Sequence, residues 1–132
     1  MPRNRVRKKL PPHAVAAAAA DLAAALDASA IVAFTSSGTT AARIARKRPK
    51  VSILAVTPDQ RVSRQLCLLW GAHSVLSKDV NTYEEMVDRA TKTALAEEFA
   101  QPADLIVVVA GIPFGEAGTT NNLRVVQIGR AA

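Results

Sequence analysis

The sequence predicts an α/β fold: a three-layer sandwich with a mostly parallel five-stranded sheet, an antiparallel last edge strand, and helices on both faces. Short apolar runs alternate with helical segments along the 132 residues, an order typical of a parallel sheet covered by helices. The last two runs are joined by a stretch rich in Gly and Pro that lacks a helical pattern. A parallel return usually needs a crossover helix, so the last strand should run antiparallel.

The first half of the chain is predicted to form helix, strand, helix and strand. Residues 14–27 are rich in alanine, which has the highest helix propensity. Residues 31–35 are predicted to form a buried strand. Residues 39–47 follow as a helix with a basic outer face, and Pro49 prevents its continuation. Residues 51–56 form the second strand.

The second half continues the alternation. Pro58 and Asp59 open a third helix, which extends through Trp70 and ends at Gly71. Asn81 or Thr82 caps a long helix that reaches about residue 100, with two glutamates in its first turn, where the helix dipole favours acids. The remaining strands are predicted at residues 74–77, 105–109 and 123–128.

Composition indicates one domain, residues 13–132, preceded by a basic and flexible tail, residues 1–12. Five of the 17 basic residues lie in the first ten positions, which contain no acid, so most of the net charge of +6 belongs to the tail. Such a tail attracts nucleic acid or anionic lipid only through non-specific charge, and we do not expect a nucleic-acid partner.

The single cysteine, Cys67, cannot form an internal disulfide, which fits a cytoplasmic location. It lies in an apolar run and is predicted to be a core residue. No apolar run approaches the roughly 20 residues that cross a bilayer, so we expect no membrane partner.

A hydroxyl-rich stretch directly follows the first strand and precedes the second helix. It consists of Thr35, Ser36, Ser37, Gly38, Thr39 and Thr40. Hydroxyls, a glycine and the positive end of a helix dipole together favour an anion, most often a phosphate. Alternatively, the hydroxyls only cap the helix.

A second loop strengthens the phosphate interpretation. Residues 110–122, with three glycines and two threonines, follow the strand at residues 105–109. If that strand lies beside the first strand, both loops flank the crevice where open α/β sheets bind ligands.

Other kinds of site are not indicated. The loop lacks the lysine of a P-loop, and no Gly-x-Gly-x-x-Gly follows the first strand. His13 and His73 lack metal-ligand spacing, so no metal site is predicted. The basic cluster at residues 43–50 either steers anions to the crevice or forms a solvated or partner-contacting face.

These motifs resemble the C-terminal domain of pyruvate kinase. The resemblance rests on residues 31–40, 45–49, 53–57, 64–65 and 70–71. Its closest part is Gly111-Ile112-Pro113-Phe114-Gly115 with Gly118-Thr119-Thr120-Asn121 and Arg124-Val125. It extends from about residue 13 to residue 129, nearly the whole chain.

The resemblance implies a regulatory domain. In that family a separate barrel domain transfers phosphate from phosphoenolpyruvate to ADP, and that barrel holds the magnesium and potassium ions. This chain alone is therefore expected to have no catalytic residues and no cofactor. It is expected to bind a phosphorylated effector and to contribute subunit contacts in a homo-oligomer or to the catalytic domain. Alternatively, it is a structural module that binds no effector and docks a separate barrel.

The resemblance also implies the effector site. The phosphate is expected at the loop of residues 35–40. The closing loop corresponds to Phe114, Gly115, Glu116, Ala117, Gly118 and Thr119. Glu116 disfavours a second phosphate, which points to a sugar monophosphate or a nucleotide such as AMP. Arg89 is a possible further contact.

Overall fold

Five strands form one sheet, and four helices cover it. The computed structural model describes residues 12–110 and 122–129. The strands are Ala30–Phe34 (β1), Ser52–Thr57 (β2), Ala72–Leu76 (β3), Leu105–Ala110 (β4) and Asn122–Gln127 (β5). The helices are Pro12–Ala25 (α1), Thr39–Arg46 (α2), Gln60–Leu66 (α3) and Tyr83–Ala96 (α4).

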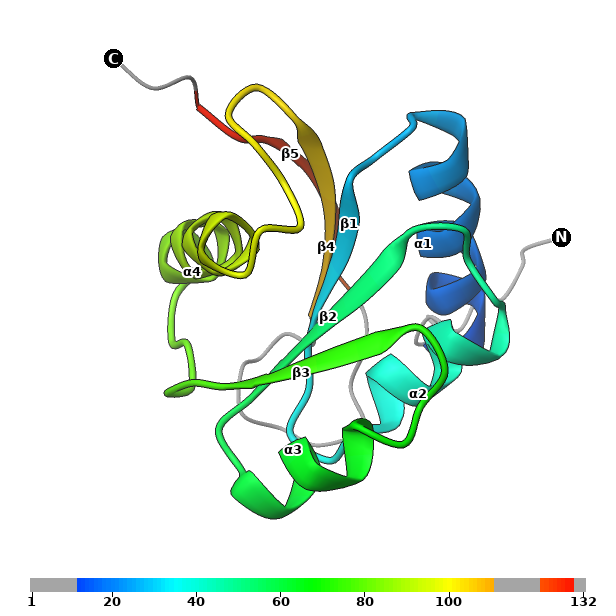
Figure 1. Cartoon of the computed structure of the whole chain (residues 1–132), viewed down its shortest axis with the longest axis vertical. Coiled ribbons are helices and arrows are strands. Elements are labelled where there is room, and N and C mark those ends of the chain that lie inside the picture. Colours follow the sequence, from blue (N-terminus) through cyan, green and yellow to red (C-terminus); the bar gives the residue numbers. More distant parts are fainter. Residues whose placement is uncertain (1–11, 111–121, 130–132) are drawn as a thin grey trace, which may run out of the picture.

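The strand order is β3-β2-β1-β4-β5. The first four strands pair in parallel, and β5 runs antiparallel to β4. Figure 1 shows α4 on one side of the sheet and α1 and α2 on the other. The predicted three-layer α/β sandwich with an antiparallel edge strand is therefore confirmed.

Alternate residues of the central strands point to opposite faces of the sheet, as the pleat requires. Ile31 and Val107 belong to the core cluster under α1 and α2. Val32 and Val108 belong to the cluster that includes Met86 of α4. All five side chains are fully buried, so the central strands are apolar because both of their faces are covered.

The third helix is shorter than predicted, and this places the cysteine outside the core. α3 ends at Leu66, and the N–H groups of residues 67–69 donate to carbonyls three residues back. Such bonds tighten the last turn and change the direction of its side chains. Leu66 takes the buried position, whereas Cys67 is exposed. The prediction that Cys67 lies in the core is wrong.

The strands are added to the sheet on one side of β1 first and on its other side afterwards, so the strand order reverses between β1 and β4. From β1 the chain passes through α2 to β2 and through α3 to β3, and α4 then crosses the other face to β4, next to β1. β1 and β4 are thus neighbours, which is the condition for the two loops that follow them to flank one crevice. The carboxyl ends of β1 and β4 therefore flank a switch point, where open α/β sheets bind ligands.

A carboxylate connects the segments that lead into β1 and β4. The Gln101 N–H donates to Asp104 Oδ2 at 2.9 Å, and Ser29 Oγ donates to the same oxygen at 2.7 Å. Both bonds lower the pKa of Asp104 from its ordinary value, and the bond from the Gln101 N–H has the larger effect. Both bonds favour the ionised carboxylate.

Asp104→Asn is expected to flatten the acid dependence of stability. Because the folded-state pKa is lowered, the stabilisation is fully present above the unfolded-state pKa and is lost as the pH falls through the folded-state pKa. Below about pH 4, the melting temperature of the wild type should therefore fall more steeply than that of the variant. Thermal melts followed by circular dichroism measure both slopes, and equal slopes would contradict the prediction.

Candidate functional site: the α2 loop and the pocket beside it

The first residue of the predicted phosphate loop shapes the turn itself. Thr35 is buried, and its N–H donates to the Val56 carbonyl at 2.9 Å. Its Oγ1 accepts the N–H of Gly38 at 2.8 Å. The Thr35 hydroxyl therefore closes the turn between β1 and α2. Thr40 is also buried, whereas Ser37 is exposed at the tip of the loop.

Gly38 lets the loop approach α3 closely. Its φ is +91°, in the left-handed region that favours glycine. A Cβ at this position would lie 3.3 Å from Val62 Cγ1 and 3.5 Å from a Leu66 methyl carbon. The start of α2 therefore packs directly against α3, with no room between them for a side chain at residue 38.

The start of α2 lacks the side-chain cap that α3 and α4 possess. Asp59 accepts first-turn N–H groups of α3, and Thr82 accepts one at α4. The cap residue of α2 is Gly38, with no side-chain cap. Ser37 Oγ accepts the N–H of Thr39 at 3.4 Å and lies 2.9 Å from Thr39 Oγ1. Hydroxyls of the loop therefore satisfy N–H groups beside Gly38, and the capping interpretation stays open together with the phosphate interpretation.

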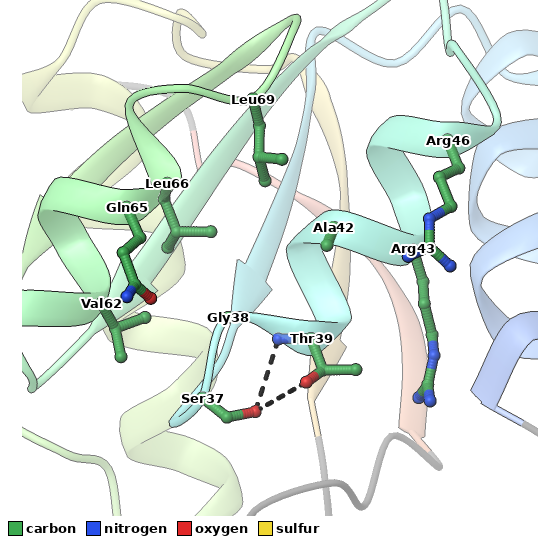
Figure 2. Close-up of a pocket in the computed structure, with 10 residues that line it drawn as sticks. All are labelled: Ser37, Gly38, Thr39, Ala42, Arg43, Arg46, Val62, Gln65, Leu66 and Leu69. Atoms are coloured by element: carbon green, nitrogen blue, oxygen red, sulfur yellow. Dashed lines mark hydrogen bonds between the residues drawn. The ribbon is translucent and has the colours of Figure 1, made fainter.

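An open pocket of about 320 Å³ lies between α2 and α3 (Figure 2). This volume is at the lower end of the range for small-molecule sites, roughly 300–1,000 Å³. Its α3 wall consists of side chains at helical spacing i, i+3, i+4 and i+7, namely Val62, Gln65, Leu66 and Leu69. Its α2 wall consists of Ser37, Gly38, Thr39, Ala42, Arg43 and Arg46. One wall is mostly apolar and the other is polar and cationic.

The cationic wall continues from the hydroxyls along one face of α2. Thr39, Arg43 and Arg46 are spaced i, i+4 and i+7, so they share a face. Figure 2 shows both arginine side chains extending toward the N-terminal end of α2, the direction that helical side chains generally take. Residues 28–58 include five basic residues and no acid. An anion at the start of α2 would therefore meet hydroxyls, a helix dipole and positive charge together.

The far ends of the two helices also touch. The guanidinium of Arg48, just beyond α2, lies 5.3 Å from the centroid of the Trp70 ring, just beyond α3. A cation over an aromatic face at this distance is attractive. The indole is otherwise open to solvent, with 61% of the residue exposed. The two helices are thus in contact both at Gly38 and beyond their carboxyl ends.

Arg89, the other predicted contact, lies on α4 across the sheet. Its Nη1 donates to Ser77 Oγ at 2.8 Å and to the Lys78 carbonyl. The structure therefore does not bring Arg89 into the pocket between α2 and α3. The predicted closing loop, Phe114–Thr119, lies outside the described residues, so its part in the site stays a prediction.

The described part of the chain offers neither a metal site nor a membrane span. Within 12–110 and 122–129, no group of His, Cys, Asp and Glu side chains is arranged to hold a metal ion. In the same ranges no helix is long and apolar enough to cross a membrane. His73 Nε2 lies 2.8 Å from Glu97 Oε1, connecting β3 to the end of α4.

The α3 wall of the pocket was not predicted from the sequence. Residues 62, 65, 66 and 69 have the i, i+3, i+4, i+7 spacing of one helix face, which was the available signal. That spacing alone predicts that this face of the helix is buried. It does not show which other element of the fold lies against the face. The role of the wall depends on α2 lying beside α3.

Comparison with known proteins identifies the family. Residues 13–126 match the model of the pyruvate kinase alpha/beta domain. The chain belongs to this family. Two pyruvate kinases from Agrobacterium vitis are 60% and 55% identical to it over 119 and 118 residues, covering 90% and 89% of the chain. The pyruvate kinase of Methylorubrum extorquens is 42% identical over 117 residues, which is 89% of the chain. The predicted resemblance is confirmed.

The match covers one part of those enzymes. The chain spans about a quarter of the length of these pyruvate kinases: 25% and 24% of the two Agrobacterium vitis proteins and 24% of the Methylorubrum extorquens protein. The match therefore establishes the alpha/beta domain for this chain. It does not extend to the parts of those enzymes that lie outside the match.

Proposed function

We propose that this chain is a regulatory domain of the pyruvate kinase type, which binds a phosphorylated effector at the loop of residues 35–40. The observation that supports this most is the start of α2, where the cap residue is Gly38 and makes no side-chain cap. There the exposed hydroxyl of Ser37 and the Thr39 hydroxyl stand beside a pocket with two arginines. First-turn N–H groups and hydroxyls are the donors that commonly bind phosphate.

The chemistry of this site is binding without group transfer. Hydroxyls and arginines hold a phosphate by hydrogen bonds and charge. Phosphoryl transfer would belong to a catalytic barrel such as the one that the resemblance implies, together with its magnesium and potassium ions. The ligand is a small phosphorylated molecule, a sugar phosphate or AMP. A cytoplasmic location and contacts with further subunits or with a barrel domain complete this proposal.

The test compares wild type with a variant that lacks two loop hydroxyls, Ser37→Ala plus Thr39→Val. Glucose 6-phosphate or AMP should raise the melting temperature of the wild type, since a hundredfold excess over the dissociation constant stabilises by about 2.7 kcal/mol. The variant should lose most of this shift, because two phosphate donors are gone. Ser52→Ala plus Thr91→Val removes two hydroxyls on other elements and should keep the full shift.

The outcome separates effector binding from a purely structural role. A ligand-induced shift that survives the loop substitutions would place the phosphate elsewhere. No shift with either compound would favour the alternative, a module that only contacts other subunits. Large exposed apolar residues such as Leu68, which is 87% exposed, and Trp70 favour that alternative.

A further inference from the structure

The outer edge of β3 carries backbone groups that have no hydrogen-bond partner. β3 is the outermost strand on the side away from β5 and pairs only with β2; Figure 1 shows it at one edge of the sheet, with α3 beside it. The carbonyl just before β3, at Gly71, and the N–H just after it, at Ser77, each form a 2.9 Å hydrogen bond with β2. Alternate residues of a parallel strand bond to the same neighbour, so residues 73 and 75 also face β2. The N–H and C=O groups of Ser74 and Leu76 therefore point to the open edge, where none of the described residues bonds to them.

β3 lacks the features that usually prevent an edge strand from pairing further. Proteins protect such edges with lysines and other charges, with proline or with a bulge. The residues of β3 include no Lys, Arg, Asp, Glu or Pro, and the register with β2 is continuous from Ala72 to Leu76. The opposite edge strand, β5, carries the exposed Arg124. Of the two edges, that of β3 is therefore the better suited to accept another strand.

Exposed apolar side chains gather beside this edge. The described residues include five exposed large hydrophobic side chains, and three of them, Leu68, Trp70 and Leu76, lie in β3 or shortly before it. Cys67 Sγ lies 3.5 Å from Ser74 Oγ, so the last turn of α3 lies against β3. Leu76 is on the same face of the strand as Ser74, because residues two apart share a face. An added strand would therefore cover apolar surface on the α3 side of the sheet.

The surface around the edge is basic. Residues 46–78 contain seven Lys and Arg residues and a single acid, Asp59, which caps α3. Neither ion pair in the described part of the chain involves any of these seven. Arg61 and Arg64 on α3, and Lys78 just beyond β3, are all exposed. This charge favours an acidic partner and opposes pairing with the same edge of a second copy, which would bring like charges together.

We propose that β3 accepts an extended segment of another protein, rich in both apolar side chains and carboxylates, as an additional strand of the sheet. The backbone of the segment pairs with the open N–H and C=O groups of Ser74 and Leu76. On the α3 side its apolar side chains cover Leu68 and Leu76, and its carboxylates approach the arginines of α3. This inference goes beyond effector binding and does not depend on it.

The probe is the capped peptide Val-Thr-Glu-Thr-Val-Thr-Glu, in which the valines and glutamates share one face and the threonines occupy the other. Amide hydrogen exchange followed by NMR reports backbone pairing directly. Near saturation the peptide should slow exchange of the Ser74 and Leu76 N–H groups by about fivefold or more, because they become hydrogen-bonded. The Val75 N–H already faces β2 and should change little. The same peptide with lysines for glutamates, or with N-methylated backbone nitrogens, should leave all three N–H groups unchanged.

Two variants test the backbone and the charge separately, with affinities measured by calorimetry. Leu76→Pro removes the open-edge N–H and leaves the neighbouring N–H groups that bond to β2. Arg61→Glu plus Arg64→Glu reverses the charge on α3 and keeps the test decisive if the proline variant fails to fold. Each should weaken peptide binding by about tenfold or more. The matched control, Lys92→Glu plus Arg124→Glu, makes the same change of net charge on α4 and β5 and should weaken binding about twofold or less.

Each outcome either supports strand addition or rejects it. Absence of peptide binding would reject it, as would binding that leaves exchange at Ser74 and Leu76 unchanged. Equal weakening in the two double variants would mean non-specific attraction to net charge. If the protein alone forms dimers in sedimentation and these N–H groups exchange more slowly as its concentration rises, the edge pairs with a second copy and the proposal is wrong. Since no phosphorylated compound is present, failure of effector binding leaves these results unaffected.

Discussion

Gly38→Ala is expected to lower the free energy of unfolding by about 2–3 kcal/mol and to abolish the ligand-induced rise in melting temperature. Part of the loss comes from placing an L-residue at a φ of +91°. The rest comes from the new Cβ, 3.3 Å from Val62 Cγ1, since the Val62 side chain or the turn must shift by a few tenths of an ångström to relieve this tight contact. Because the proposed phosphate donors lie on this turn, the same shift should disrupt binding of the proposed effector.

Gly71→Ala is the matched control for this substitution. Gly71 also has a positive φ, +75°, but its added Cβ would meet nothing within 4 Å. Gly71→Ala should therefore lower the free energy of unfolding only by the backbone contribution, about 1–2 kcal/mol. This variant should keep the ligand-induced rise in melting temperature. Urea unfolding measures both variants, and equal losses would show that contact with α3 has no importance. Adding Val62→Ala to Gly38→Ala should restore part of the stability only if that contact is the cause.

Met86→Ala is expected to lower the free energy of unfolding by about 2–5 kcal/mol, the usual range for truncating a long buried side chain. Met86 is fully buried in the cluster between α4 and the sheet. Among the described helices α4 alone packs on that face of the sheet (Figure 1), so no second helix can move into the cavity.

The control for Met86→Ala lies further along the same helix. Lys92 has a side chain that is 75% exposed and pairs with Asp88 at 3.0 Å. Lys92→Ala should change stability by less than about 1 kcal/mol, because exposed ion pairs contribute little. Denaturant midpoints of the two variants provide the comparison. A loss for Met86→Ala as small as that for Lys92→Ala would mean that α4 packs loosely.

The fold was predictable because its signals are local. The central strands β1, β2 and β4 are short, mostly apolar runs. Asp59 and Thr82 mark helix starts by residue type alone. The end of α3 was less predictable. Leu68, Leu69 and Trp70 continue an apolar pattern that suits a helix, yet the last turn tightens and turns outward after Leu66. Residue types do not distinguish an α-helical last turn from a tighter one.

The candidate site was only half visible in the sequence. The loop of residues 35–40 is contiguous, and its hydroxyls and glycine indicate a phosphate without knowledge of the fold. The α3 wall and the orphan nitrogen of Arg43 depend on which elements lie side by side. In the sequence Arg43 was one member of a basic cluster. What distinguishes Arg43 is that one guanidinium nitrogen, Nη1, is buried without a hydrogen-bond partner, and this depends on how α2 packs.

The contact between Arg48 and Trp70 gives the protein a built-in optical reporter. The chain contains a single tryptophan, and its ring lies beyond the end of α3 against a cation just beyond the end of α2. Indole emission depends on nearby charge and on water, so its spectrum follows the separation of those two helix ends. A molecule that binds in the pocket near the start of α2 and moves α2 relative to α3 would change that emission spectrum. The change could be followed in the unlabelled protein.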